Sequence, residues 1–301
     1  MKKIQNISIV GGTHGNEYTG SYLIRKLAIE HIHEKWNELH INLITGNPKA
    51  FQKGVRFIDS DLNRAFAKND LENHHLAGYE ANRAKVLDHI IGPKGSPKTD
   101  FILDVHTTTA HMGVTLILFD NNLYNLQTAS YLKSKIPNCF IYYISMDTYA
   151  DSSDNPFLNS LAPYGLALEI GPIANGLVRY DLFELAYKAV NTTLEFISMT
   201  NANTMPEIDT TIEVFEHRKE IEFPTDDKGN ITGIIHKNIQ DKDYHPIKKG
   251  DPLFVTFAGD IITYNEDNVM YPVFINEAAY YYKKIAFSLT EKKSYSIGDT
   301  V

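Results

Sequence analysis

A histidine and a glutamate separated by two residues follow the first apolar stretch of this 301-residue chain. The stretch is rich in β-branched residues and ends at paired glycines; residues 7–17 read Ile-Ser-Ile-Val-Gly-Gly-Thr-His-Gly-Asn-Glu. His14 and Glu17 on such a turn can point at one metal ion, because glycines permit backbone conformations that other residues resist. Catalytic zinc keeps three protein ligands and one position for water, so the pair predicts a third ligand, a base and an anion-binding group elsewhere.

The candidate for the third ligand is His106, which follows the apolar stretch at residues 101–105. A closely spaced pair with a distant third ligand is a familiar arrangement at catalytic zinc, and both segments end strands that could be neighbours in one sheet. Taken alone, a histidine at a strand end is more often a surface residue. The presence of His14 and Glu17 makes a metal ligand the better interpretation.

The candidate for the base is Glu169, which lies inside the apolar stretch at residues 166–170. An unpaired carboxylate is costly to bury, so Glu169 either has a salt-bridge partner or faces the metal at the carboxyl edge of the sheet. In the second position it could take a proton from water, whose pKa bound zinc lowers toward ~7.

The anion-binding group is sought in a charged segment that lacks periodicity, residues 52–73, which we expect to be a long loop. Arg56, Asn63 and Arg64 lie within nine positions and could hold a carboxylate and polarise a carbonyl oxygen. Read alone, such a loop is more often a solvated surface. Asp61 is placed to orient a ligand or an arginine from behind.

The surrounding pattern predicts the elements that position these residues. Residues 7–10, 18–32 and 39–45 read as strand, helix and strand, which suggests a βαβ unit. Further strands are expected at 101–106, 114–119, 140–145 and 166–170, and helices at 78–91, 122–136 and 181–199. After a linker the chain reads as short strands, so we predict an α/β catalytic domain at 1–204 and a smaller β-rich domain at 205–301.

Composition excludes several classes of function. The 43% hydrophobic content supplies an ordinary core, and the net charge of −8 argues against nucleic acid as a partner. A single cysteine, Cys139, excludes an internal disulfide and a thiolate metal cage. No apolar run approaches the roughly 18 residues that span a membrane, and no signal-peptide core is visible. We therefore expect a cytoplasmic protein without a membrane partner.

Five motifs, in order along almost the whole chain, resemble the succinylglutamate desuccinylase/aspartoacylase family of zinc hydrolases. They are Gly-Gly-Thr-His14-Gly-Asn-Glu17, Asp61-Leu-Asn63-Arg64, Asp104-Val-His106, Glu169-Ile-Gly-Pro172 and Tyr271-Pro-Val-Phe-Ile-Asn-Glu-Ala-Ala-Tyr280.

The resemblance implies a zinc-carboxypeptidase-like fold, a mixed central sheet flanked by helices, with a small C-terminal β-rich domain that shapes the active-site entrance. It implies zinc-dependent deacylation of a small anionic N-acyl amino acid, first of all N-acetyl-L-aspartate to acetate and L-aspartate, with one Zn²⁺ per chain. Carried over residue by residue, it implies zinc ligands at His14, Glu17 and His106, a general base at Glu169, a carbonyl-polarising group at Arg56, carboxylate binders at Asn63, Arg64 and Tyr280, and basic residues near the substrate at Lys283 and Lys284.

One departure from the family pattern bears on the substrate. Asn159 stands where an arginine for the side-chain carboxylate is expected, and Arg179 or a lysine of the C-terminal domain could replace it. The alternatives are a deacylase that prefers non-acidic side chains, a succinylglutamate desuccinylase-like enzyme, a carboxypeptidase, or a catalytically silent metal-binding protein. The assembly state stays open, with a homo-oligomer as one alternative.

Overall fold

A computed structural model describes residues 3–145 and 154–297. The expected βαβ unit is present, because β1 and β2 are parallel and α1 lies between them in the chain. The first half of the described chain contains β1 (Asn6–Gly11), α1 (Tyr18–Ile29), α2 (Ile32–Lys35), β2 (His40–Thr45), α3 (Pro48–Lys53), α4 (Lys68–Glu72), α5 (Tyr79–Ile91), β3 (Phe101–Thr107), β4 (Gly113–Leu118), α6 (Leu123–Lys135) and β5 (Cys139–Tyr143).

The second half begins with a strand and a long helix and continues with strands. It contains β6 (Tyr164–Gly171), α7 (Tyr180–Asn201), β7 (Thr211–Glu222), β8 (Gly233–Ile235), β9 (Pro252–Thr256), β10 (Ile261–Thr263), β11 (Tyr271–Val273) and β12 (Ile285–Ser296). Helix α7 ends at Asn201 and β7 begins at Thr211; the domain boundary expected after residue 204 stays a prediction.

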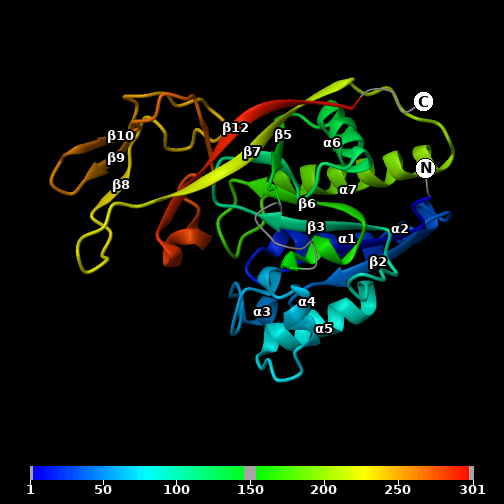
Figure 1. The fold of residues 1–301 in the computed structure, drawn as a ribbon. Coiled ribbons are helices and arrows are strands. Elements are labelled where there is room, and N and C mark those ends of the chain that lie inside the picture. Colours follow the sequence, from blue (N-terminus) through cyan, green and yellow to red (C-terminus); the bar gives the residue numbers. More distant parts are fainter. Residues whose placement is uncertain (1–2, 146–153, 298–301) are drawn as a thin grey trace.

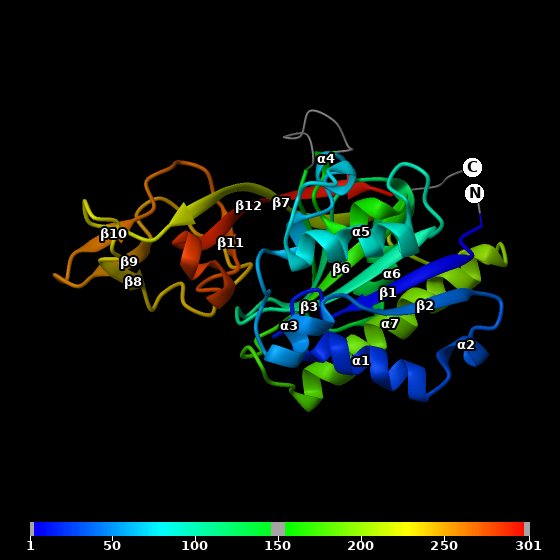
Figure 2. The same cartoon turned by 90° about the horizontal axis from the view of Figure 1, so that it is seen from below.

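One mixed sheet of nine strands organises the molecule, in the order β11-β12-β7-β5-β4-β6-β3-β1-β2. Strands β1, β2, β3 and β6 run parallel to one another, and β4 is antiparallel to β6. Helices cover both faces: α1, α6 and α7 pack on one large core, while α4 and α5 close a smaller core on the other face (Figure 2). The predicted α/β fold with a mixed central sheet flanked by helices is therefore confirmed.

The C-terminal strands differ in one respect from the sequence expectation. Strands β7 and β12 have 12 residues each, pair with each other, and join the central sheet through β5. Figure 1 shows them running out of the sheet into a lobe that holds the three-stranded sheet β10-β9-β8. The lobe is β-rich as expected, but its two longest strands are shared with the central sheet.

The segment at residues 52–73 also differs from the long loop that we expected. It contains the end of α3, a 3-10 turn at Leu62–Arg64 and the five-residue helix α4. Helical turns of this length stabilise little on their own and show no clear periodicity, so the sequence pattern does not reveal them.

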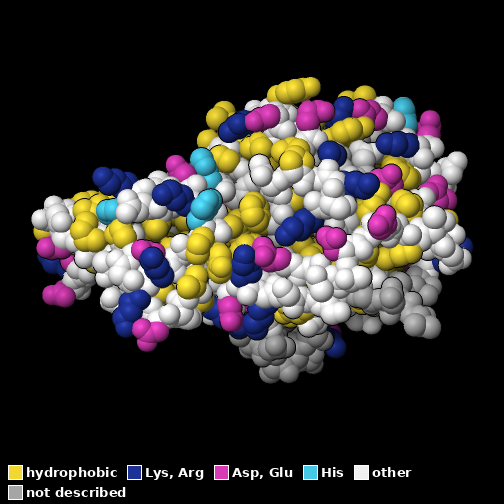
Figure 3. Space-filling view, turned by 90° about the horizontal axis from the view of Figure 1, so that it is seen from above, with side chains coloured by type: hydrophobic (Ala, Val, Ile, Leu, Met, Phe, Trp, Pro, Cys, Tyr) yellow, Lys and Arg dark blue, Asp and Glu magenta, His cyan; other side chains and the backbone are white. Residues whose placement is uncertain are grey.

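The surface carries charges of both signs. On the face in Figure 3, Lys and Arg side chains lie among Asp and Glu side chains over both the body and the narrower lobe. Within residues 3–145 and 154–297, none of the helices has the length and apolar character needed to cross a membrane.

Candidate active site

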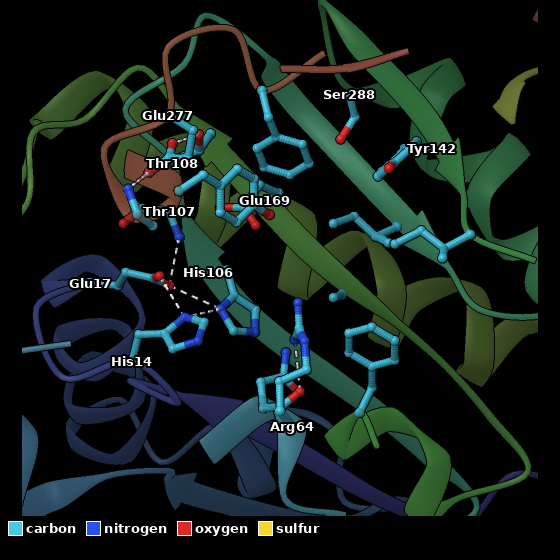
Figure 4. A pocket seen from close by; sticks show the side chains of 18 of the residues that line it. His14, Glu17, Arg64, His106, Thr107, Thr108, Tyr142, Glu169, Glu277 and Ser288 are labelled. Atoms are coloured by element: carbon cyan, nitrogen blue, oxygen red, sulfur yellow. Dashed lines mark hydrogen bonds and ion pairs between the residues drawn. The ribbon is translucent and has the colours of Figure 1, made fainter. Parts of the chain in front are cut away.

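The candidate metal ligands meet where the parallel strands end. Strand β1 pairs with β3, and His14 and Glu17 follow β1 while His106 lies near the end of β3. Strand β6 pairs with β3 on the other side, and the register places Glu169 directly beside His106. Side chains at paired positions of neighbouring strands point to the same face. The strands that we expected to be neighbours are neighbours, and they bring these residues together (Figure 4).

Three ligand atoms converge at this point. His14 Nδ1 lies 2.6 Å from Glu17 Oε1, His106 Nδ1 lies 2.9 Å from Glu17 Oε2, and the two Nδ1 atoms are 3.2 Å apart. All three side chains are buried. Two imidazole nitrogens and a carboxylate form the donor set of a catalytic zinc site, which leaves a fourth position for water or substrate. The residues present therefore fit the zinc ion that the sequence resemblance implies.

Two glycines make the turn before the ligands feasible. Gly12 has φ of +70°, a conformation that side chains with Cβ resist. Gly15 lies so close to α3 that a Cβ there would sit 2.2 Å from the carbonyl carbon of Ala50. The chain can therefore place His14 and Glu17 on the same side of the turn.

In each candidate histidine ligand, the ring nitrogen that faces away from the other ligands contacts a carboxylate. His14 Nε2 lies 3.0 Å from Asp61 Oδ1, and His106 Nε2 lies 2.7 Å from Asp104 Oδ2. Burial alone would raise the pKa of Asp61, but His14 and Arg56 hold it well below its usual range. These contacts leave the two Nδ1 atoms facing the ligand position and orient both rings.

Glu169 is buried beside the metal ligands without a partner. Burial, followed by the negative charge of Glu17, raises the pKa of Glu169 well above its usual value. Among the contacts of the described residues, the Glu169 carboxylate has no hydrogen bond or salt bridge. A carboxyl group in this condition is able to take up and release a proton, which a structural salt bridge would prevent.

The arginine-containing loop lies against the same pocket. Arg56 donates to Glu17 Oε1 at 3.1 Å and contacts His14 Nε2 at 2.9 Å. The guanidinium of Arg64 stacks on Phe157, with its carbon atom 4.5 Å from the ring centre. Asn63, Arg64 and Arg56 line one pocket with the metal ligands, so the loop is not a solvated surface.

The C-terminal segment contributes to the pocket, but not with all its predicted residues. Tyr280 and Lys283 line the pocket, whereas Lys284 does not. Lys284 has φ of +59°, and its ammonium group lies 2.7 Å from the position that a Cβ on Gly229 would occupy. The side chain of Lys284 lies toward Gly229, and the structure does not bring Lys284 to the site.

The two residues considered for the substrate side chain lie outside the pocket. Asn159 is buried, contacts the carbonyl oxygen of Ile102 at 3.5 Å and faces a separate cavity. Arg179 is exposed and pairs with Asp181 at 2.6 Å. Neither residue is available to a substrate bound near His14.

The far end of the pocket was not anticipated from the sequence. Apolar side chains that the sequence did not single out line the pocket, among them Ile117, Phe119, Ile144 and Phe157. Tyr142, His217, Glu220 and Ser288 line it too, and Figure 4 shows Tyr142 and Ser288 across the pocket from His14, with Glu169 between.

Glu277 is a further residue that the sequence did not single out for a role. Its carboxylate accepts hydrogen bonds from Thr108 Oγ1, from the Thr109 amide at 2.8 Å and from Thr109 Oγ1 at 3.0 Å. The segment directly after His106 is therefore held by the C-terminal part of the chain. The contact of Asp104 with His106, by contrast, could have been predicted from the sequence. Asp104 lies two residues before His106, and residues two apart in a strand share one face.

Comparisons with known proteins agree with this arrangement. Residues 3–197 match the model of the succinylglutamate desuccinylase/aspartoacylase catalytic domain, and residues 210–292 match that of the AstE/AspA barrel-sandwich hybrid domain. A probable aspartoacylase of Trichodesmium erythraeum is 44% identical over 98% of this chain and 99% of its own length. An N-acyl-aromatic-L-amino acid amidohydrolase of Xenopus laevis is 36% identical over 96% of this chain and 95% of its own.

A solved structure is similar over the whole fold. The crystal structure of murine aminoacylase 3 superposes with a TM-score of 0.92 at 32% sequence identity, covering 99% of this chain and 98% of that one. Matches to family models over both parts of the chain, and relatives of this identity over nearly full length, establish the relationship. The chain belongs to the succinylglutamate desuccinylase/aspartoacylase family of amidohydrolases.

Proposed function

We propose that this protein is a zinc-dependent deacylase that hydrolyses N-acyl-L-amino acids to a carboxylate and a free amino acid. The observation that carries the proposal is the unpartnered, buried Glu169 beside the converging atoms of His14, Glu17 and His106. A zinc ion held by these three residues would lower the pKa of water and polarise the acyl carbonyl.

The protein's own groups account for the proton movements. Glu169 accepts a proton from the water molecule that attacks the acyl carbon, and then returns it to the nitrogen of the leaving amine as the C–N bond breaks. Arg56, which reaches the ligands of the site at 2.9–3.1 Å, donates hydrogen bonds to the carbonyl oxygen as it gains negative charge.

The α-carboxylate of the substrate would be held by the other loop residues. Arg64 can present a planar fork of donors, and Asn63 and Tyr280 lie beside it in the pocket. When the carboxylate is held, the substrate amide lies at a fixed distance from Glu169. The binding energy of the carboxylate then orients the acyl carbon for attack by water. This clamp supports N-acyl amino acids, which carry one free carboxylate, over simple amides.

The side-chain preference is proposed to be for an uncharged side chain over that of aspartate. Several apolar side chains line the pocket with the clamp, and Asn159 and Arg179 lie outside the pocket. N-acetyl-L-aspartate is the second candidate substrate, because Lys283 does line the pocket and offers one cation. The cytoplasmic location and a homo-oligomeric assembly stay predictions.

The test is amine release from a panel of N-acetyl-L-tyrosine, N-acetyl-L-aspartate, N-succinyl-L-glutamate and a dipeptide by zinc-loaded protein. We expect turnover of acetylated amino acids, loss of turnover on chelation and recovery with zinc. Glu169→Gln should keep the metal and lower kcat by about 10²–10⁴-fold, because general base catalysis is removed. Exposed Glu195→Gln is the control. Turnover by Glu169→Gln at the wild-type rate would exclude Glu169 as the base.

A further inference from the structure

An irregularity in β7 places two polar side chains on the pocket side of the sheet. Leu289 of β12 pairs with Lys219, but the next residue, Thr290, pairs with His217, so Arg218 is an extra residue in β7. This is a β-bulge. In a regular strand, residues three apart point to opposite faces. The extra residue Arg218 shifts this alternation by one position, so His217 and Glu220 point to the same face and both line the pocket.

The neighbouring cations do not neutralise Glu220. Arg218 pairs with Glu216 at 3.3 Å and with Glu291, and Lys219 pairs with Glu266. Within the described residues Glu220 itself has no hydrogen bond or salt bridge, although it lies directly opposite Ser288. Glu220 is exposed to solvent, so this side of the pocket presents a solvent-accessible carboxylate without a partner among the described residues.

The other polar groups of this wall are arranged around Glu220. The Tyr142 hydroxyl lies 2.7 Å from His217 Nδ1, and Ser288 projects from β12 beside them. The apolar residues Ile117 and Phe157 line the same pocket, and the guanidinium of Arg64 lies over the ring of Phe157. A substrate side chain that reaches Glu220 meets apolar side chains of the pocket and, at its end, a hydrogen-bond acceptor.

We propose that Glu220, re-aimed by the bulge, selects N-acyl amino acids whose side chain is apolar and ends in a hydrogen-bond donor, as in N-acyl-L-tyrosine, and rejects side-chain carboxylates. The proposal rests on the proposed function and names the substrate class of the same site. A tyrosine side chain spans the apolar part and presents its hydroxyl to the carboxylate. An aspartate side chain places a second negative charge in the same pocket, which is unfavourable.

The test compares kcat/KM ratios in the zinc-loaded protein. For the wild type we expect kcat/KM to be highest with N-acetyl-L-tyrosine, lower with N-acetyl-L-phenylalanine and lowest with N-acetyl-L-aspartate. Glu220→Gln should lower the tyrosine-to-phenylalanine ratio, and Glu220→Lys should shift the tyrosine-to-aspartate ratio toward aspartate by about 10-fold or more. Glu222→Lys carries the same charge change on the same strand outside the pocket and should shift neither ratio.

A second measurement separates this proposal from the deacylase function. Binding of free L-tyrosine and L-aspartate is measured by calorimetry for wild type, Glu220→Lys and Glu222→Lys, with melting temperatures as a check on folding. The proposal is supported if wild type binds L-aspartate more weakly than L-tyrosine and Glu220→Lys reverses this preference, even if no substrate is hydrolysed. Unchanged ratios in Glu220→Lys, or no binding of either amino acid by wild type, overturn it.

Discussion

The imidazole of His106 is held between two carboxylates, with Nε2 2.7 Å from Asp104 and Nδ1 2.9 Å from Glu17. The other oxygen of Asp104 accepts a hydrogen bond from Thr13 Oγ1 at 2.7 Å. Because Asp104 is fully buried in β3, this contact fixes both the tautomer and the plane of the ring.

Asp104→Asn should therefore weaken metal binding. The amide keeps the size of the side chain but replaces one acceptor oxygen by a donor, so it no longer enforces the tautomer with Nδ1 free. We expect a loss of about 10–100-fold in zinc affinity, measured by competition with a chelator. Asp181→Asn, at an exposed ion pair, should leave the affinity unchanged. Equal affinities for the two variants would contradict the role given to Asp104.

Arg64→Ala should act on substrate binding more than on the chemical step. A charged hydrogen bond to a carboxylate contributes about 1.5–3 kcal/mol, which corresponds to a rise in KM of roughly 10–150-fold. Steady-state kinetics with N-acetyl-L-tyrosine measures the effect. Arg179→Ala removes an arginine outside the pocket and should leave KM as it is. A change confined to kcat would place Arg64 at the reacting carbonyl instead.

Glu80 anchors the loop that carries Arg56 and Asp61. Its buried carboxylate accepts from Asn47 Nδ2 at 3.0 Å and from the backbone amides of Ile58, Asp59 and Ser60 at 2.7, 2.9 and 3.3 Å. A buried donor left without a partner costs about 1–3 kcal/mol, which applies to the amide of buried Asn47; Ile58 is half-buried and Asp59 and Ser60 are exposed.

Glu80→Ala should therefore lower the free energy of unfolding by about 1–3 kcal/mol. Hydrogen exchange of the three loop amides should quicken and kcat should fall, because Arg56 loses its placement. Glu80→Gln keeps the oxygen that meets Asn47 and Ile58 and should recover part of each loss. Exchange rates that stay at wild-type values in Glu80→Ala would refute the anchoring role.

Asp243 should make stability depend on pH. Burial, with a smaller contribution from Asp241, raises the pKa of Asp243 to about 7. In the unfolded chain an aspartate releases its proton near pH ~4, so between pH ~4 and ~7 only the folded state holds it. The free energy of unfolding therefore falls as the pH rises through this window, by at most about 1.4 kcal/mol per pH unit.

Asp243→Asn removes this proton uptake. Urea unfolding at pH 5, 6, 7 and 8 should show wild type losing stability relative to Asp243→Asn as the pH rises, and the difference should level off above pH 7. Asp241→Asn, which changes an exposed carboxylate nearby, is the control and should retain most of the wild-type slope. Parallel curves for wild type and Asp243→Asn would rule out the titration of Asp243.

Sequence reasoning located the residues that lie at strand ends, because their signal is local. His14 and Glu17 follow an apolar strand by a glycine turn, and His106 and Glu169 lie in apolar strands that parallel pairing aligns. The same periodicity predicts the strands and the long helices of the first two hundred residues, but not the short helices α2, α3 and α4.

What the sequence could not show depends on distant pairing or on a local irregularity. Glu277 meets Thr108 across 169 positions of chain, and no spacing rule connects them. His217 and Glu220 are three apart in a strand, so alternation assigns them to opposite faces until the bulge at Arg218 is known. Lys284 follows Lys283 directly, and the sequence does not show that Lys283 lines the pocket while Lys284 lies toward Gly229.

The paired strands β7 and β12 connect the C-terminal lobe to the body, because both belong to the nine-stranded sheet. Tyr142 and Tyr143 of β5 pair with Phe215 and Glu216 of β7, so the strand that continues into the lobe is part of the main sheet. Within the described residues, the side of the pocket that β7 and β12 contribute, with His217, Glu220 and Ser288, is therefore continuous with the main sheet. For the same reason, a fragment cut after residue 204 would expose the edge of β5, and we expect it to self-associate rather than fold as an independent enzyme.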